Sequence, residues 1–471
     1  MASPRLDKKK MRVKAPSLFD TFGYGVRPQR PTTFATLMVS LAVFFHFGLL
    51  VILWQEVKAV PSIAWTGTST ALLCLAALAA RHGSISVRNA TVCTIFFFVA
   101  YPMFAWLSYK VWGQYSSERE ALLLQTVPIM ALGLALYLVG AAARSHRTYR
   151  ALWMAWTVIA CYVLLNINKL DPQSMYQASL ADAGVSLNYQ QLGDAFAICS
   201  VILAPRIRQP LLQWLFIGAA VCIMFIIPSR SAAFFGAVSL GMTLIIFGSR
   251  FTRISLITLG VLAVLGYQSG TFAELFEGSR FESALTPDTE DGSWSMRQEI
   301  MDYGMTLLIG KPFTGEWAFQ LSDLKFSGYY IHNALDVWAQ TGLIPFLIFL
   351  TIWIFLLDAL LTGLARWPRI AKESIPVLLF AALSWTLSRN ITFVALFFCL
   401  GFASAALTQA RYGQPGRRRR RSQGAFPADP GFAHTEFVNT QFGNTQFQPP
   451  EHLHGEHRVP PRSPYEPPPF R

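Results

Sequence analysis

Residues 211–248 read LLQWLFIGAAVCIMFIIPSRSAAFFGAVSLGMTLIIFG, two apolar runs joined by the tight turn Ile227-Pro228-Ser229-Arg230-Ser231. Each run has about 17 residues, which is enough for a helix to cross about 30 Å of hydrocarbon. The stretch therefore predicts two membrane-spanning helices, with an arginine in the turn between them.

Similar apolar runs recur along most of the chain. The 471 residues are 53% hydrophobic and 14% charged, whereas a soluble globular domain has about 25% charged residues. We therefore predict an all-α, polytopic membrane protein, and a water-soluble enzyme or a secreted scaffold is excluded. The twelve predicted spans are 33–54, 60–80, 90–108, 121–142, 151–167, 190–204, 211–227, 231–248, 254–270, 334–358, 375–388 and 391–410.

Basic residues indicate the orientation of these spans. They concentrate in alternate short loops, and both ends of the chain lie on the same side as those loops. Because cytoplasmic loops are enriched in Lys and Arg, both termini are expected in the cytoplasm. The first apolar run is long and follows a basic leader of 32 residues, which is unlike a cleavable signal peptide.

The two ends differ in composition from the transmembrane domain at 33–410. Residues 1–32 form a basic cytoplasmic segment, and residues 411–471 hold eleven of the 27 prolines. Such a tail cannot bury a core, so we predict a disordered Arg/Pro-rich segment, which either only fixes topology or binds lipid or a partner. Most of the net charge of +13 lies in these ends as an orientation signal, so nucleic-acid binding is not expected. The six cysteines lie in apolar runs without paired spacing, as expected of small core residues.

One long loop, 271–333, lies on the opposite face and holds ten of the 26 acidic residues. Capping-box spacing at 295–298 precedes an apolar pattern, which predicts an amphipathic helix over 295–309 at the membrane interface. The acidic run 288–291 is bracketed by a proline and a glycine, so a hydrated turn is favoured over a divalent-cation site.

The candidate catalytic residue also lies on this opposite face. Of the eight histidines, only His332 is predicted there, at the start of the tenth span with Asn333 placed to cap that helix. A helix N-terminus favours the neutral imidazole that a general base needs, whereas Asp336, one turn later, favours the charged form. The alternative is that His332 merely caps a helix.

Three arginines depart from the cytoplasmic bias of basic residues. Arg230 and Arg389 lie in tight turns of the opposite face, and Arg297 lies in the first turn of the predicted loop helix. Guanidinium groups near free N–H groups at helix starts form phosphate sites. Ser229 or Ser231 is expected to cap the helix at Arg230. Snorkelling to the interface is the alternative for each arginine.

Four motifs resemble those of the O-antigen ligase and O-antigen polymerase family, membrane enzymes that move glycans from polyprenyl diphosphate carriers. They are Asn188-Tyr189-Gln190 with Leu192-Gly193; Ser229-Arg230-Ser231-Ala232-Ala233; Trp294-Ser-Met-Arg297 through Gly310-Lys-Pro312 and Gly315; and Ile331-His332-Asn333 with Gly342-Leu343. The resemblance covers about residues 30–410. Two features depart from it: Gly315-Glu316-Trp317, where the family often has a second glycine, and the tail.

The resemblance implies an inverting glycosyltransferase at the periplasmic face of a bacterial inner membrane, with no cofactor and no metal. Arg230 and Arg297 would bind the diphosphate of an undecaprenyl-diphosphate-linked glycan, with Arg389 as a weaker candidate. His332 would accept the proton of the acceptor hydroxyl. The supporting residues would be Asn188, Ser229, Ser231 and Asn333.

Several functions stay open. The atypical loop and tail favour a polymerase, which extends carrier-linked repeat units of O-antigen or exopolysaccharide, over a ligase, which transfers glycan to lipid A core. A twelve-helix secondary transporter belongs to another class, but such proteins usually show two similar halves. A third hypothesis is a catalytically silent scaffold for envelope polysaccharide assembly proteins. The chain has no Walker loop, dinucleotide fingerprint, HExxH or serine-hydrolase motif.

Overall fold

The computed structural model describes residues 33–56, 73, 76, 87–112, 115–167, 189–227, 229–271, 292–322, 331 and 333–412. This part of the chain is helical and contains no strand, which confirms the all-α prediction. The N-terminal segment 1–32, nearly all of the tail, and the second predicted span apart from residues 73 and 76 lie outside the described residues.

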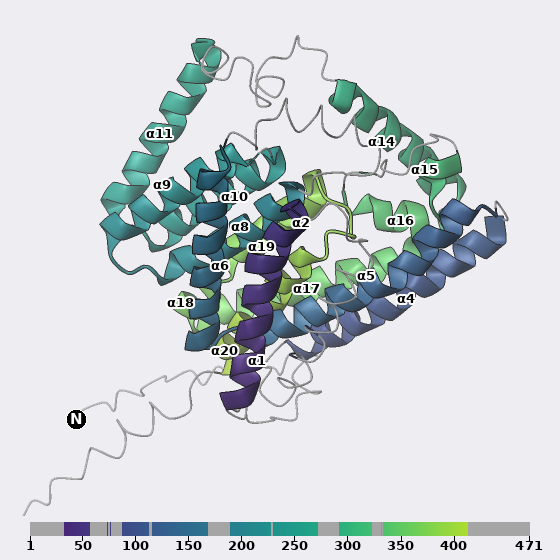
Figure 1. Ribbon diagram of the computed structural model, residues 1–471, viewed down its shortest axis with the longest axis horizontal. Helices are drawn as coiled ribbons and strands as arrows, with labels where there is room; N and C mark the ends of the chain where they lie inside the picture. Colours follow the sequence, from purple (N-terminus) through teal and green to yellow (C-terminus); the bar gives the residue numbers. More distant parts are fainter. Residues whose placement is uncertain are drawn as a thin grey trace, which may run out of the picture. The chain divides into compact units, whose positions relative to one another are not determined.

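Figure 1 shows the helical segments, coloured along the sequence from purple at the N-terminus to yellow at the C-terminus. They are α1 (Thr33–Phe44), η2 (Phe45–Leu50), α2 (Val51–Glu56), α4 (Arg88–Trp112), α5 (Ser117–Ala142), α6 (His146–Leu165), α8 (Tyr189–Leu203), η4 (Ala204–Arg206), α9 (Pro210–Ile226), α10 (Arg230–Phe247), α11 (Arg250–Gln268), α14 (Gly292–Gly310), α15 (Phe319–Ser322), α16 (Leu335–Thr341), α17 (Leu343–Arg366), α18 (Pro368–Lys372), α19 (Ile375–Leu387) and α20 (Ala395–Tyr412).

Among the described residues, eight helical stretches are long and apolar enough to cross a membrane. They are Thr33–Leu53, Arg88–Trp112, Ser117–Ala142, His146–Leu165, Arg230–Phe247, Arg250–Gln268, Leu343–Arg366 and Pro368–Leu387. Two shorter apolar helices, Pro210–Ile226 and Ala395–Ala410, accompany them. The structure therefore supports a helical membrane protein, while the number of twelve spans and the orientation stay predictions.

The tenth predicted span, 334–358, is wrong as a single helix. The short α16 ends at Thr341, and α17 begins at Leu343 after a break at Gly342. Gly342 has a backbone φ of +84°, and a Cβ atom there would lie 2.0 Å from the Phe313 carbonyl oxygen. Only glycine tolerates this combination, and hydropathy alone does not reveal such a break.

The segment that follows α14 packs into this break. The Pro312 carbonyl accepts hydrogen bonds from the Leu343 N–H at 3.0 Å and from the Trp338 indole Nε1 at 2.7 Å. Gly315, with φ +59°, passes so close to α16 that a Cβ would lie 2.6 Å from the Ala339 carbonyl oxygen. The loop after α14 therefore packs against the end of α16 and the start of α17 at this break.

Two other predicted boundaries also change. The loop helix α14 runs over Gly292–Gly310 and begins before 295, so the predicted capping box at 295–298 lies inside the helix rather than at its start. The last span begins at Ala395 rather than 391, because residues 388–394 form an irregular connection after α19.

Close helix packing fixes the position of this connection. α20 packs along α5, and a Cβ at Gly401 would lie 1.9 Å from the Tyr137 carbonyl oxygen. Phe397, in the first turn of α20, contacts Phe98 of α4 with ring centroids 4.6 Å apart and Trp385 of α19 at 4.9 Å. These contacts fix the end of α19 and the start of α20, between which the connection runs.

Burial differs strongly between helices of similar composition. Every residue from 192 to 203 of α8 is buried, whereas Thr252 is the buried residue of α11. Among the described cysteines, Cys199 and Cys399 are buried as expected of core residues, while Cys161 and Cys222 are exposed, and none forms a disulfide.

Candidate active site

The structure covers the predicted site residues unevenly. His332 and Asn188 lie outside the described residues, and Arg297 lies in α14 with its side chain outside them. Arg230, Arg389, Ser229, Ser231 and Asn333 are described.

The turn before α10 is arranged differently from the capping prediction. Ser229 is the residue before the helix, but its side chain makes no capping hydrogen bond. Its buried hydroxyl oxygen instead accepts a hydrogen bond from Nη2 of Arg389 at 3.2 Å. Arg230, the first residue of α10, and Ser231 are half-buried.

Arg389 does not snorkel to a surface. Its side chain is 3% exposed, and its guanidinium donates to both carboxylate oxygens of Asp194, from Nε at 3.0 Å and from Nη2 at 3.1 Å. The Phe393 ring lies 4.6 Å from the guanidinium carbon. A bidentate pair of this kind is strong and directional. Asp194 therefore neutralises Arg389 and links α8 to the connection after α19.

Sequence reasoning missed Asp194. The signal was present, since Asp194 is the single charged residue of α8, and ionisable residues inside apolar spans are costly and often functional. The neighbouring Gly193 lets α8 approach the start of α10, because a Cβ there would lie 2.8 Å from Cβ of Ser229. The predicted motifs at 192–193 and 229–233 therefore meet in space.

The turn before α16 is held by side chains of its own segment. Ala334 is the residue directly before α16, and it makes no side-chain capping bond. The Asn333 Oδ1 accepts a hydrogen bond from the N–H of Leu335, the first helical residue, at 2.8 Å. Asn333 therefore caps the helix from one position earlier. The Ala334 N–H donates to the Trp385 carbonyl at 2.6 Å, which joins this turn to the end of α19.

Asp336 is the second charged residue that lies in this network. It is fully buried, and it accepts hydrogen bonds from the Ile331 N–H at 3.2 Å and from Nε2 of Gln340 at 2.7 Å. Burial raises the pKa of Asp336 to about 7, and these hydrogen bonds oppose the rise. α16 lies outside the helices that are long enough to cross a membrane.

Three turns distant in sequence therefore meet. Arg389 bonds to Ser229 at the start of α10, and the Ala334 N–H, in the turn before α16, bonds to the Trp385 carbonyl near the end of α19, just before the connection at 388–394. Chemically, the cluster combines the buried, neutralised Arg389–Asp194 pair with the half-buried Arg230, the residue that follows Ser229. It also anchors the residues on both sides of position 332.

A second buried charge cluster holds the loop after α14. Glu316 pairs with Nη2 of Arg119 at 3.6 Å and with the Lys311 ammonium group, and the Lys311 Nζ lies 4.0 Å from the centre of the Trp112 ring. The Trp317 N–H donates to the Ser108 hydroxyl at 2.8 Å. Sequence reasoning noted Gly315-Glu316-Trp317 only as a departure from a family pattern, whereas here Glu316 anchors the loop to α5.

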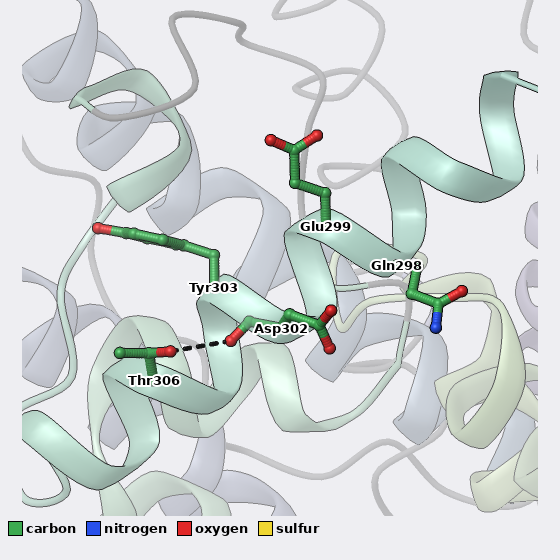
Figure 2. A pocket seen from close by; sticks show the side chains of 5 residues that line it. All are labelled: Gln298, Glu299, Asp302, Tyr303 and Thr306. Carbon is green, nitrogen blue, oxygen red and sulfur yellow. Dashed lines mark hydrogen bonds between the residues drawn. The ribbon is translucent and has the colours of Figure 1, made fainter.

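An open hollow of about 610 Å³ lies beside α14 (Figure 2). Its described lining residues are Gln298, Glu299, Asp302, Tyr303 and Thr306. In Figure 2 Glu299 and Tyr303 point in different directions, and Thr306 bonds to the backbone oxygen of Asp302 at 3.0 Å. These side chains do not converge on a point, so the buried network is the better candidate site. Among the described residues, no group of three His, Cys, Asp or Glu is placed to hold a metal ion, and the acidic run 288–291 lies outside them.

Comparison of the chain with protein-family models, curated proteins and solved structures found no match.

Proposed function

We propose that this protein is a membrane glycosyltransferase that moves a glycan from undecaprenyl diphosphate to an acceptor hydroxyl at the periplasmic face of a bacterial inner membrane. The observation that carries the proposal is the junction of the Ser229-Arg230 turn, the turn before α16 and the segment that runs from the end of α19 through the connection at 388–394. These segments hold most of the residues for which the family resemblance implies a role.

Arg230 and Arg297 are the proposed ligands of the carrier diphosphate. Arg230 begins α10, so its guanidinium acts together with the free N–H groups of the first helical turn. The two arginines would stabilise the charge that develops on the diphosphate as its bond to the sugar breaks. Arg389 is already neutralised by Asp194, so we assign it an indirect part, in which its bond to Ser229 holds the turn that presents Arg230.

His332 is the proposed general base. In the sequence it lies between Ile331, whose backbone amide donates to Asp336, and Asn333, whose side chain accepts from the Leu335 N–H. The acceptor oxygen attacks the anomeric carbon and forms the new glycosidic bond, its proton passes to His332, and the bond from the sugar to the diphosphate breaks. Attack from the side opposite the leaving group inverts the anomeric configuration. The carrier diphosphate is already an activated leaving group, so the proposal needs no cofactor and no metal.

The proposed acceptor is a second carrier-linked repeat unit, which makes the enzyme a polymerase of O-antigen or exopolysaccharide. A ligase that uses lipid A core as acceptor is the alternative within the same chemistry.

Glycan transfer by the purified full-length protein in nanodiscs tests this proposal. The protein receives a carrier-linked repeat unit with EDTA present, and wild type is compared with His332→Ala and Arg230→Lys at matched folded yield. Matched controls are His146→Ala, an exposed histidine that begins α6, and Arg250→Lys, an exposed arginine that begins α11 as Arg230 begins α10.

We expect wild type and both controls to build longer carrier-linked chains. In the two site variants the rate of transfer should fall by at least about 100-fold. If His332→Ala and Arg230→Lys keep their activity, the assigned roles are refuted. Wild type that works only when lipid A core is supplied would establish the ligase, and wild type that is inert with both acceptors would refute the glycosyltransferase.

A further inference from the structure

Asp336 is a buried carboxylate whose neighbours are neutral hydrogen-bond donors. Its Oδ1 accepts from the Ile331 N–H and its Oδ2 from the Gln340 carboxamide. Each carboxylate oxygen therefore accepts from one neutral donor.

Two donors, one on each oxygen, explain why a carboxylate occupies this position. A carboxylate has two acceptor oxygens, whereas an amide has one and would present its own NH₂ group to a donor. Burying such a group without a cation is costly, so its hydrogen bonds must offset much of that cost.

One bond of Asp336 leads to the segment that matters for the proposed chemistry. The Ile331 N–H, which donates to Asp336, belongs to the residue before His332 in the sequence. Beyond His332, the Ala334 N–H donates to the Trp385 carbonyl of α19. The carboxylate therefore holds the backbone on one side of the candidate base, and α19 holds it on the other.

We infer that Asp336 is a positioning residue, which holds the backbone at Ile331, next to the candidate base in the sequence. The inference rests on the proposed function for its catalytic consequence, since it assigns Asp336 the task of orienting His332. The structural part, that Asp336 holds the Ile331 amide, is independent of any activity.

Hydrogen–deuterium exchange of the full-length protein in nanodiscs tests the structural part. Asp336→Ala removes the acceptor of the Ile331 N–H and is expected to speed exchange in the peptide that contains this amide by at least about tenfold. Asp336→Asn keeps one acceptor oxygen and is expected to exchange more slowly than Asp336→Ala. The control Thr341→Val removes another buried side-chain hydrogen bond of α16, that to the Val337 carbonyl, and should leave the 331 peptide unchanged.

Steady-state transfer kinetics test the catalytic part. Asp336→Ala is expected to lower kcat by about 10- to 100-fold while KM for the donor stays within about threefold, because a displaced base affects the chemical step more than donor binding. Asp336→Asn should recover part of kcat. Asp358→Asn, an exposed carboxylate of α17, and Thr341→Val should both resemble wild type.

The two measurements separate the inference from the proposed function. Unchanged exchange at Ile331 in Asp336→Ala overturns the inference whatever the activity. Faster exchange with unchanged kcat also overturns it, because the turn would then not position the base. If the wild-type protein shows no transfer, the proposed function fails, and the exchange data alone decide whether Asp336 holds the turn.

Discussion

Asp194 and Glu373 are both carboxylates that pair with arginine, but in different surroundings. Asp194 meets Arg389 inside the helical bundle, and each side chain is 3% exposed. Glu373, in the turn between α18 and α19, meets Arg144 at 3.0 Å and Arg206 at 2.9 Å, with side-chain exposures of 14%, 8% and 37%. The first pair joins segments of the candidate site, and the second joins three connections between helices.

The difference shows how solvent decides what an ion pair contributes. When one partner of a fully buried ion pair is lost, the other charge stays buried and unpaired, which lowers the free energy of unfolding strongly. At a solvent-accessible pair, water partly replaces the lost partner, so the loss is smaller. Burial at Asp194 therefore makes the connection at 388–394 dependent on Arg389. At Glu373 two arginines share the carboxylate, so neither is expected to be indispensable.

The largest effect is expected at Arg389. Arg389→Ala leaves Asp194 charged and buried, and should lower the free energy of unfolding by about 3–5 kcal/mol. Equilibrium unfolding in detergent micelles, followed by tryptophan fluorescence, measures the loss.

The double variant Asp194→Leu/Arg389→Met is the control for this prediction. It removes both charges and should regain most of the stability, but it should stay deficient in transfer because the Ser229 hydroxyl loses its donor. A double variant no more stable than Arg389→Ala would show that the uncompensated charge is not the cause.

Asp336 extends the comparison to a buried carboxylate whose hydrogen-bond donors are neutral. Its folded-state pKa is raised to about 7 by burial, so between about pH 4 and pH 7 the folded state binds more protons than the unfolded state. The contribution of Asp336 to stability is therefore expected to fall as pH rises through this range. Thermal unfolding at pH 5 and pH 8 measures it.

Asp336→Asn is the matched variant, since it cannot titrate. Wild type should lose more Tm than Asp336→Asn between pH 5 and pH 8. Equal pH dependence in the two proteins contradicts a raised pKa at Asp336.

Glu373→Gln should have a smaller effect than Arg389→Ala. The change removes the shared charge but keeps an acceptor oxygen, so a loss of about 1–2 kcal/mol is expected. The same unfolding assay compares the two variants directly. A loss as large as that of Arg389→Ala would mean that exposure does not distinguish the two clusters.

Arg206→Gln should have the smallest effect. With 37% of its side chain exposed, its pairing is expected to contribute at most about 1 kcal/mol, and the contribution should shrink at high salt. Unfolding at about 0.05 M and 0.5 M salt tests both statements. Arg144→Gln is the paired measurement, since Arg144 is 8% exposed and should show less salt dependence.

Much of the helical architecture could be predicted because hydropathy is a local property. The runs at 90–108, 121–142 and 231–248 became α4, α5 and α10 with ends shifted by a few residues. The break at Gly342 was missed, because its cause is the packing of Phe313 and Gly315 against that backbone.

The candidate site could be predicted only as a set of unusual residues. Arg230 and Arg389 stood out because they lie in turns expected to be on the non-cytoplasmic face, and Asn333 because of its place before a helix. Asp194 and Asp336 were not assigned to the site, since each lies in a mostly apolar segment and gains its meaning from a partner.

The sequence by itself determined that the chain forms apolar helices of membrane-spanning length, and which polar residues lie at their ends. Only the tertiary structure decided that α8 is buried while α11 is exposed, and that Arg389 is neutralised across 195 positions of sequence. The physical reason is that hydrophobicity and helix formation depend on neighbouring residues, whereas burial and ion pairing depend on which distant segments pack together.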